Sequence, residues 1–373
     1  MANILRSCIR SSLGDLQTAK EKIKSSEIEL GKKEIQAIEG KVSLPYYSLS
    51  EKIEDTYKSI YGVLHNVVDE LLEGFSQSQK ERTAIIVGTS IIDWNSIHSI
   101  ESSNYEYKRK PFSTSKRSID SYAKDISNSF GLNGFTQTIN TACTSSANAL
   151  LEASNLIDAG LYDYVIVVGI EVFSEMMSSG FYAMQLLSST TLKSFDTDRD
   201  GTILGEAIAA ILVSNEDSPW KIKGGYSNCD ALSITSASEN GQEFINMMRN
   251  SLMDAGVTAQ EITALKAHAT ATSSNDIAEI NAIKNVFESS VVFTALKPYI
   301  GHTIGACGAL EIALFMACID DGFLPRTMNH KKSILTEYIP LLEHKECFEG
   351  TFMLNFFGFG GNNTSIILTK EQK

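Results

Sequence analysis

One cysteine lies where a helix is expected to begin and has the surroundings of a nucleophile. Cys143 belongs to the run TACTSSA, which precedes an apolar helical stretch ending at Gly160. The free N–H groups and the positive dipole at a helix start stabilise a thiolate, so the position predicts a lowered thiol pKa and a nucleophilic sulfur. The alternative is a small buried hydrophobic residue, which is the usual role of an isolated cysteine.

Two histidines occupy comparable positions. His268 follows a short strand-like run, and His302 lies at the start of another apolar helix. Lys297 precedes His302 closely and is expected to neutralise a nearby carboxylate, either Asp276 or Glu279. A hydrogen-bonded core histidine is the alternative for His268. Zinc binding by the cysteine and the histidines is not expected, because no two of these ligands are close in sequence.

A third candidate segment, NFFGFGGNN at 355–363, combines glycines with aromatic residues after a strand-like run. It could provide a backbone N–H donor to an oxyanion and an aromatic gate over an acyl pocket. A plain turn with core phenylalanines is the alternative.

The elements that must position these residues can be predicted from hydrophobic periodicity. Helical spacing predicts surface-packed helices in 15–40 and 52–73. Short apolar, β-branched runs predict buried strands, which alternate with helices in an α/β layered fold. These runs are 83–87, 164–168, 207–213, 263–267, 291–294 and 351–354.

An internal repeat constrains the architecture further. Segment 143–152 aligns without gaps with 302–311, and similar helix endings follow at 157–160 and 319–322. The repeat predicts two halves, 1–217 with Cys143 and 218–373 with both histidines, whose equivalent helices present Cys143 and His302 to a shared centre. Chance matching of small residues is the alternative.

Composition bounds the functional class. The chain has 373 residues, of which 43% are hydrophobic and 21% charged, as in a folded enzyme of one or two lobes. A net charge of −13 argues against a nucleic-acid surface. No apolar stretch reaches the roughly 20 residues of a membrane span, and six scattered cysteines form no CxxC pair, so we expect a cytoplasmic protein with reduced thiols.

One basic segment departs from this acidic balance. The run KRKPFSTSKR at 108–117 contains no acid and could receive an acidic partner, although a solvated loop is the alternative. Its basic residues are Lys108, Arg109, Lys110, Lys116 and Arg117.

Taken together, the motifs resemble the β-ketoacyl-acyl carrier protein synthases of the thiolase fold, of the Cys-His-His type found in ketoacyl synthases I and II and in polyketide ketosynthases. The resemblance covers roughly residues 80 to 370. It rests on TACTSSA, FDTDRDGTILGEA from Phe195, AHATATSSNDIAE around His268, KPYIGHTIGACGALE from Lys297 and FGFGGNN from Phe357. It implies a five-layered αβαβα core of two duplicated βα halves.

The resemblance also implies roles. Cys143 would carry the acyl group, with its own N–H and that of Phe359 as the oxyanion hole, and Phe357 would belong to the gate. His268 and His302 would assist decarboxylation of malonyl-carrier protein. Lys297 and Glu279 would form a supporting charged network. Asp276, Thr270 and Thr272 would hold the loop.

The same family implies no cofactor, and it implies an acyl carrier protein as partner, with the basic segment as the docking site. It further implies a homodimer, or a heterodimer with a chain-length-factor-like homologue, acting in fatty acid, polyketide or aryl polyene-type elongation. The alternatives are a subunit active only with, or serving as, a chain-length partner, and a thiolase or non-condensing acyltransferase.

Three departures indicate a specialised branch. Ala269 and Ala271 replace two glycines of the family motif, so the pocket shape could differ. The C-terminal motif ends in Asn362-Asn363, and the opening strand is hardly recognisable in 4–14. The apolar segment 178–191 could line the acyl pocket or belong to the core.

Overall fold

The computed structural model describes residues 1–38, 40–51, 57–90, 118–132, 134–231, 233, 237–288 and 291–371. In this part of the chain the main sheet has the strand order β10-β9-β13-β14-β8-β1-β7-β6-β4-β5. Its middle pair, β1 and β8, is joined through two residue pairs, Asn3 with Lys221 and Ile4 with Trp220. The sheet therefore consists of two sets of five strands joined at a narrow seam.

Both sets have the same pairing pattern, which shows that the fold is duplicated. From the outer end of each set, two parallel pairings are followed by two antiparallel ones. The first set contains β1 (Asn3–Ser11), β4 (Thr83–Thr89), β5 (Thr136–Ile139), β6 (Tyr164–Glu171) and β7 (Ala207–Ser214). The second contains β8 (Trp220–Cys229), β9 (Ile262–Lys266), β10 (Phe293–Thr294), β13 (Gly350–Phe357) and β14 (Asn362–Lys370).

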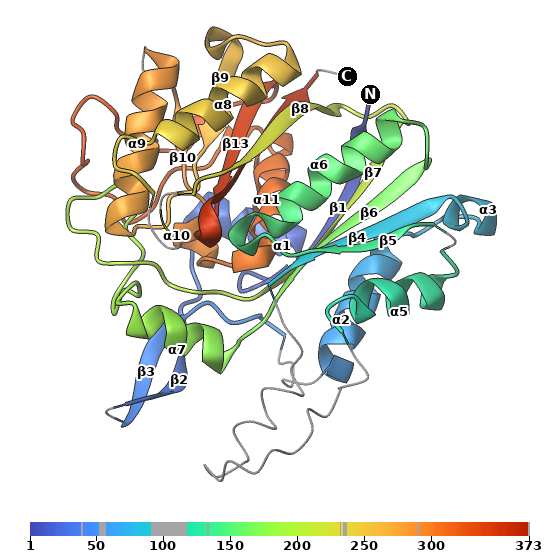
Figure 1. Cartoon of the computed structure of the whole chain (residues 1–373), viewed down its shortest axis with the longest axis horizontal. Helices are drawn as coiled ribbons and strands as arrows, with labels where there is room; N and C mark the ends of the chain where they lie inside the picture. The colour runs from blue at the N-terminus through green and yellow to red at the C-terminus, as the bar shows by residue number, and fades with distance from the viewer. Residues whose placement is uncertain are drawn as a thin grey trace.

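Helices cover both outer faces and fill the space between the two sets of strands (Figure 1). The inner pair is α6 (Ser145–Asp158) and α11 (Cys307–Asp320). One outer layer contains α2 (Tyr57–Leu71) and α5 (Ser121–Phe130), and the other α8 (Gln242–Ala255) and α9 (Ser273–Phe287). The remaining helices are α1 (Leu16–Ser25), α3 (Gln77–Lys80), α7 (Glu175–Ala183) and α10 (Lys297–Ile300).

Alternating strand residues explain this layering. In β4, Ile85 packs in the cluster with α2 and α5, whereas its neighbour Ile86 packs in the cluster with α6 and α11. In β13, Phe352 belongs to the inner cluster and Met353 to the outer one with α8 and α9. Successive side chains of a strand point to opposite faces, so buried strands without polar alternation need helices on both sides. The predicted αβαβα layering is confirmed.

The repeat exists, but in a different register from the sequence alignment. A 3-10 turn at Ala142–Thr144 leads into α6, and one at Ile304–Ala306 leads into α11. The first residue of each turn has a positive φ, 52° at Ala142 and 38° at Ile304. Cys143 is therefore the counterpart of Gly305, not of His302. The two inner helices pack so closely that a Cβ on Gly308 would lie 2.1 Å from the nitrogen of Ala147. Such close packing requires small residues in both helices, and two runs of small residues can be aligned in more than one register.

The predicted elements are otherwise confirmed, with one correction near the N-terminus. The six predicted strands correspond to β4, β6, β7, β9, β10 and β13, and α2 lies in the predicted 52–73 helix. The helix predicted over 15–40 ends at α1, because Ser26 caps it in the left-handed conformation. A hairpin follows, β2 (Gly31–Ala37) with β3 (Gly40–Tyr46), whose Gly40 has a φ of 122° and whose Pro45 is unsuited to a helix interior.

A small two-stranded antiparallel sheet, β11 (Phe323–Leu324) with β12 (Lys345–Glu346), completes the described elements. Of the main sheet, β1 is the opening strand that was hardly recognisable in 4–14, and strands β5, β8 and β14 were not anticipated from the sequence. Among the described helices, none combines the length and the apolar character that crossing a membrane requires.

Candidate active site

One cavity at the junction of the two halves is lined by seven of the ten predicted site residues that the structure describes. It is lined by Cys143, His268, Thr270, Thr272, His302, Phe357 and Phe359, together with further residues such as Phe181, Leu186 and Phe244. The first half supplies the cysteine, and the second supplies both histidines. Residues far apart in sequence thus meet in one mostly apolar site, which is where catalytic groups are expected.

Cys143 lies in the 3-10 turn directly before α6, as the sequence predicts, and its side chain is buried. The prediction of a lowered pKa is wrong in direction. Burial raises the thiol pKa to about 12, although Lys297 and the N–H groups of Phe359 and Cys143 act to lower it. Desolvation of the thiolate outweighs the helix start, so Cys143 is a neutral thiol at neutral pH.

The C-terminal glycine-aromatic run lies directly against this cysteine. The main-chain N–H of Phe359 faces the Cys143 sulfur and acts to lower the thiol pKa. A Cβ on Gly358 would lie 3.1 Å from the Cys143 nitrogen, so glycine permits this close approach. The Phe359 ring stacks on Phe181, with ring centroids 5.4 Å apart. Two main-chain N–H groups and the ring of Phe359 thus lie around the Cys143 thiol.

The two histidine rings meet edge to face at the other side of the cavity, with centroids 5.3 Å apart. Burial, Lys297 and Lys266 all lower both histidine pKa values well below the ordinary value, and His302 further lowers that of His268. Both rings are therefore neutral at neutral pH. A neutral imidazole donates one hydrogen bond and accepts one, so the pair can donate to a common oxygen without a formal positive charge.

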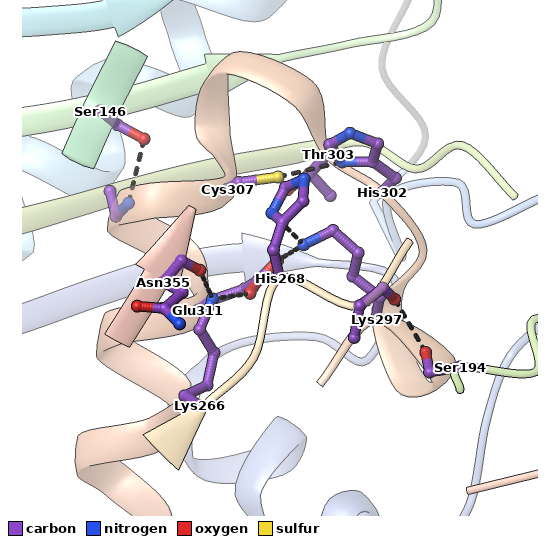
Figure 2. A network of polar contacts seen from close by, with 12 residues as sticks. Ser146, Ser194, Lys266, His268, Lys297, His302, Thr303, Cys307, Glu311 and Asn355 are labelled. Carbon is purple, nitrogen blue, oxygen red and sulfur yellow. Dashed lines mark hydrogen bonds and ion pairs between the residues drawn. The ribbon is translucent and has the colours of Figure 1, made fainter. Parts of the chain in front are cut away.

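The network behind the histidines differs from the sequence prediction. Lys297 Nζ lies 3.2 Å from His268 Nδ1 and donates to Glu311 Oε1 at 2.6 Å (Figure 2). The expected carboxylate partners, Asp276 and Glu279, do not pair with Lys297. The sequence alignment of the repeat pairs Glu311 with Glu152 and gives Glu311 no role. What marks Glu311 in the sequence is its position as an acid in the middle of the apolar run CGALEIALFMACI.

Asp276 and Glu279 instead hold the backbone that carries His268. Glu279 accepts from the N–H groups of His268 and Ala269, at 2.7 and 2.8 Å. Asp276 accepts from the N–H groups of Ala271 and Phe195, at 3.1 and 2.7 Å. Both carboxyls are fully buried. They shape the loop that presents His268 and do not reach the cavity.

Three further groups were missed by the sequence reasoning. Cys307 Sγ lies 3.1 Å from His302 Nδ1. Lys266 Nζ donates to the second oxygen of Glu311 at 2.6 Å. Glu171 accepts from the Ser90 hydroxyl at 2.7 Å and from the N–H of Gly305 at 3.0 Å, next to the turn before α11. Lys266, directly before Ala267-His268, is the most visible of these in the sequence, as a lone cation in an apolar strand.

The two alanines of the 268–272 loop have left-handed backbones, with φ of 55° at Ala269 and 62° at Ala271. Neither lines the cavity. Ala269 packs in the cluster of α8 and α9, and Ala271 packs with Tyr47, Leu192 and Ile203. Their methyl groups therefore fill the core and do not reshape the pocket, contrary to the expectation from the sequence.

We expect Ala269→Gly to change the free energy of unfolding by less than about 1 kcal/mol, because relief of left-handed strain offsets the loss of one buried methyl. Ala269→Val should cost about 3 kcal/mol, since a branched side chain both strains this backbone and overpacks the core. Urea denaturation followed by circular dichroism measures both. A neutral valine variant would contradict this account of the loop.

From segment 178–191, Phe181 and Leu186 line the cavity. The basic residues Lys108, Arg109, Lys110, Lys116 and Arg117 lie outside the described residues. In the described part of the chain, no group of three or more His, Cys, Asp or Glu side chains is arranged to hold a metal ion.

Comparison with known proteins gives a consistent result. The model of the beta-ketoacyl synthase N-terminal domain matches residues 62–218, and that of the C-terminal domain matches 221–331. The 3-oxoacyl-acyl-carrier-protein synthase 2 of Rhizobium meliloti (strain 1021) is 30% identical over 323 residues, which cover 79% of this chain and 76% of that protein. A mitochondrial 3-oxoacyl-acyl-carrier-protein synthase of Arabidopsis thaliana is also 30% identical, over 78% of this chain and 69% of its own length.

Solved structures share the fold over the whole chain. A ketosynthase from Xenorhabdus doucetiae, solved in complex with its chain length factor, superposes with a TM-score of 0.85 at 24% identity, covering 99% of this chain and 98% of that one. A type II polyketide ketosynthase structure, solved with its acyl-carrier protein, gives a TM-score of 0.86 at 18% identity, covering 100% and 99%. These neighbours have the thiolase-like fold of ketosynthases. By its sequence matches and its fold, the chain belongs to the beta-ketoacyl synthase family.

Proposed function

We propose that this protein is a β-ketoacyl-acyl carrier protein synthase, which condenses an acyl group held on Cys143 with a malonyl unit delivered by an acyl carrier protein. One observation carries the proposal. A single cavity combines a thiol, two main-chain N–H donors at that thiol, and two neutral histidines. A condensation needs an electrophile held as a thioester and a carbanion generated away from water, and these groups supply both.

In the first step the Cys143 sulfur attacks the carbonyl carbon of an acyl-carrier thioester. The bond from carbon to the carrier sulfur breaks, and the thiol proton passes to the departing carrier thiolate. The N–H groups of Cys143 and Phe359 stabilise the oxyanion of the tetrahedral intermediate, each contributing about 3 kcal/mol. Their position at the sulfur places them beside the carbon that it attacks.

In the second step the malonyl thioester loses CO₂, and the electron pair of the broken carbon–carbon bond forms an enolate. The N–H groups of His268 and His302 donate to the enolate oxygen. The enolate carbon then attacks the Cys143 thioester, a new carbon–carbon bond forms, and the cysteine departs as a thiolate that regains a proton. The product is a 3-oxoacyl-carrier protein.

The two halves divide this work. We assign the nucleophile Cys143 to the half formed by residues 1–217, and both catalytic histidines to the half formed by residues 218–373, which also supplies the N–H of Phe359. The chain passes from the first set of strands to the second between β7 and β8, and the boundary between the two family matches lies in the same place, which supports the division.

An acyl carrier protein is the proposed partner for both substrates. The charge of the segment from Lys108 to Arg117 supports docking there, and because that segment lies outside the described residues, the assignment remains a prediction from charge. A carrier-bound substrate is consistent with the proposed cytoplasmic location.

A second ketosynthase-fold chain is the other proposed partner. β5 lies at the end of the sheet, and β4 is its one strand neighbour within the described residues. The main chain of an unpaired edge strand is suited to pairing with another strand. The partner would be an identical chain or a chain-length-factor-like homologue.

The proposed activity is tested by reconstitution. The purified chain is incubated with an acyl-carrier protein and malonyl-carrier protein, and mass spectrometry follows the carrier-bound product. Formation of a 3-oxoacyl-carrier protein with release of one CO₂ supports a condensing enzyme. Acyl exchange between carriers without CO₂ release would instead identify a non-condensing acyltransferase.

Sedimentation of the purified chain separates the two assemblies. A stable homodimer with full condensing activity supports an enzyme that works with its own copy. A monomer, or an inactive homodimer whose activity appears on addition of a ketosynthase-fold homologue, supports the partner-dependent alternative.

A further inference from the structure

Two buried lysines share one buried carboxylate beneath the active-site histidines. Lys266 Nζ donates to Glu311 Oε2 and Lys297 Nζ to Glu311 Oε1, both at 2.6 Å (Figure 2). All three side chains are fully buried. Lys266 also donates to the main-chain oxygen of Asn355 at 2.7 Å, and its Nζ lies 3.7 Å from the centroid of the Phe356 ring.

The charges in this cluster do not cancel. Glu311 offsets one ammonium group, so one positive charge remains while Lys266 is protonated. The groups that face Lys266 are Glu311 and Cys307 from α11, Lys297 from α10, and the Asn355 carbonyl and Phe356 ring from β13. Burial lowers the pKa of Lys266 to about 8, whereas Glu311 keeps that of Lys297 raised. Lys266 is therefore the lysine that titrates first.

We propose that Lys266 is a positioning residue for the condensation assigned above: it fixes Glu311 against Lys297 and supplies the unbalanced positive charge beneath His268 and His302. The proposal rests on the proposed function for its kinetic consequence, and on the geometry alone for its effect on the histidines.

The contact between Lys297 and His268 determines which ring nitrogen of His268 carries the hydrogen. An ammonium group has donors and no acceptor, so Nδ1 of His268 must accept from it. The neutral ring then carries its hydrogen on Nε2, where it can donate to an enolate oxygen. Lys266 contributes in two ways. It holds the second oxygen of Glu311, which keeps Lys297 in place, and its charge disfavours protonation of the rings while favouring an anion in the cavity.

Lys266→Met tests this role without breaking the buried ion pair. The variant leaves Glu311 with Lys297, which is a neutral pair, and methionine fills most of the same volume. Glu311→Gln is a poorer test because it leaves two buried lysines without a counter-charge. The matched control is Lys370→Met. It removes an ion pair with Asp320, 2.7 Å long, at the C-terminal end of β14.

The first measurement is independent of the reaction. Histidine ring nitrogens labelled with ¹⁵N are titrated by NMR in the wild type, Lys266→Met and Lys370→Met. Loss of the Lys266 charge should raise the pKa of both His268 and His302, and Lys370→Met should leave both unchanged. Folded Lys266→Met protein in which both rings titrate as in the wild type would overturn the proposal.

The second measurement is the rate of malonyl-carrier decarboxylation as a function of pH. Below pH 8 we expect Lys266→Met to lower kcat by about tenfold with little change in KM, because the charge acts on the transition state. As pH rises through about 8, Lys266 in the wild type loses its proton, so the two rates should converge. A constant ratio across this range would exclude the charge effect.

The two readouts separate the possible failures. Shifted histidine pKa values in a protein that never decarboxylates malonyl-carrier protein would refute the proposed function while retaining the positioning role. Normal decarboxylation with unshifted histidines would refute the role of Lys266 and leave the proposed function intact.

Discussion

Cys143→Ala is expected to abolish both acyl loading and condensation, with a loss of at least about 10⁴-fold in kcat. No other described side chain combines a sulfur nucleophile with a place on the cavity wall and two main-chain N–H donors. The protein is incubated with acyl-carrier protein and then with malonyl-carrier protein. Intact-protein and peptide mass spectrometry then measures the acyl adduct and its discharge. The wild type should show an acyl adduct on the peptide with Cys143, and the adduct should discharge as a 3-oxoacyl-carrier protein.

The control is Cys229→Ala, which removes the exposed cysteine most open to non-specific acylation. It should load and discharge like the wild type. An acyl adduct that survives in Cys143→Ala, on any other residue, would contradict the assignment of the nucleophile. A wild type that binds carrier protein without ever forming an adduct would favour a structural or partner-dependent role.

The burial of Cys143 shows what sequence motifs can and cannot provide. The motif TACTSSA places the residue correctly at a helix start, because turn and helix signals are local. The sign of its pKa shift depends on how much of the rest of the molecule covers the thiol. That coverage comes from segments as distant as Phe359, and no local pattern reports it.

The carboxylate partner of Lys297 could not be predicted from the sequence for the same reason. Asp276 and Glu279 are conspicuous acids near His268 in sequence, so they were the expected partners of Lys297. Their carboxylates instead accept hydrogen bonds from main-chain N–H groups, three in the loop of His268 and one at Phe195. Glu311 reaches Lys297 because α11 passes beneath the histidines, and only the three-dimensional arrangement shows this.

The duplication was predicted from similar segments, but its register was not. Runs of serine, alanine and glycine match one another at many offsets, so the alignment slipped by three residues and paired Cys143 with His302. Backbone geometry removes the ambiguity, since Ala142 and Ile304 share the unusual positive φ at the start of their helices. His302 therefore reaches the site from the segment before the second turn.

His268→Ala and His302→Ala should separate the two half-reactions. We expect each variant to load the acyl group on Cys143 almost normally, while malonyl decarboxylation falls by about 10²- to 10⁴-fold. The reason is that the oxyanion of acyl transfer is held by main-chain N–H groups, whereas the enolate depends on the two rings. Adduct formation by mass spectrometry and CO₂ release from malonyl-carrier protein measure the two steps separately.

The control is His65→Ala, whose ring lies 3.0 Å from the Ser129 hydroxyl, away from the cavity lining. It should leave both steps unchanged. Equal loss of acyl loading and decarboxylation in the two active-site variants would contradict the division, because it would require the histidines to act in the transfer step as well.

Asparagine substitutions distinguish hydrogen-bond donation by the histidine rings from proton uptake by them. An amide side chain donates a hydrogen bond but cannot take up a proton near neutral pH. If the histidines act as neutral donors, as their lowered pKa values indicate, His302→Asn should retain much more decarboxylation than His302→Ala. If His302 instead had to accept a proton, asparagine would be no better than alanine. The Asn-to-Ala ratio at His302 therefore distinguishes electrostatic stabilisation of the enolate from general base catalysis.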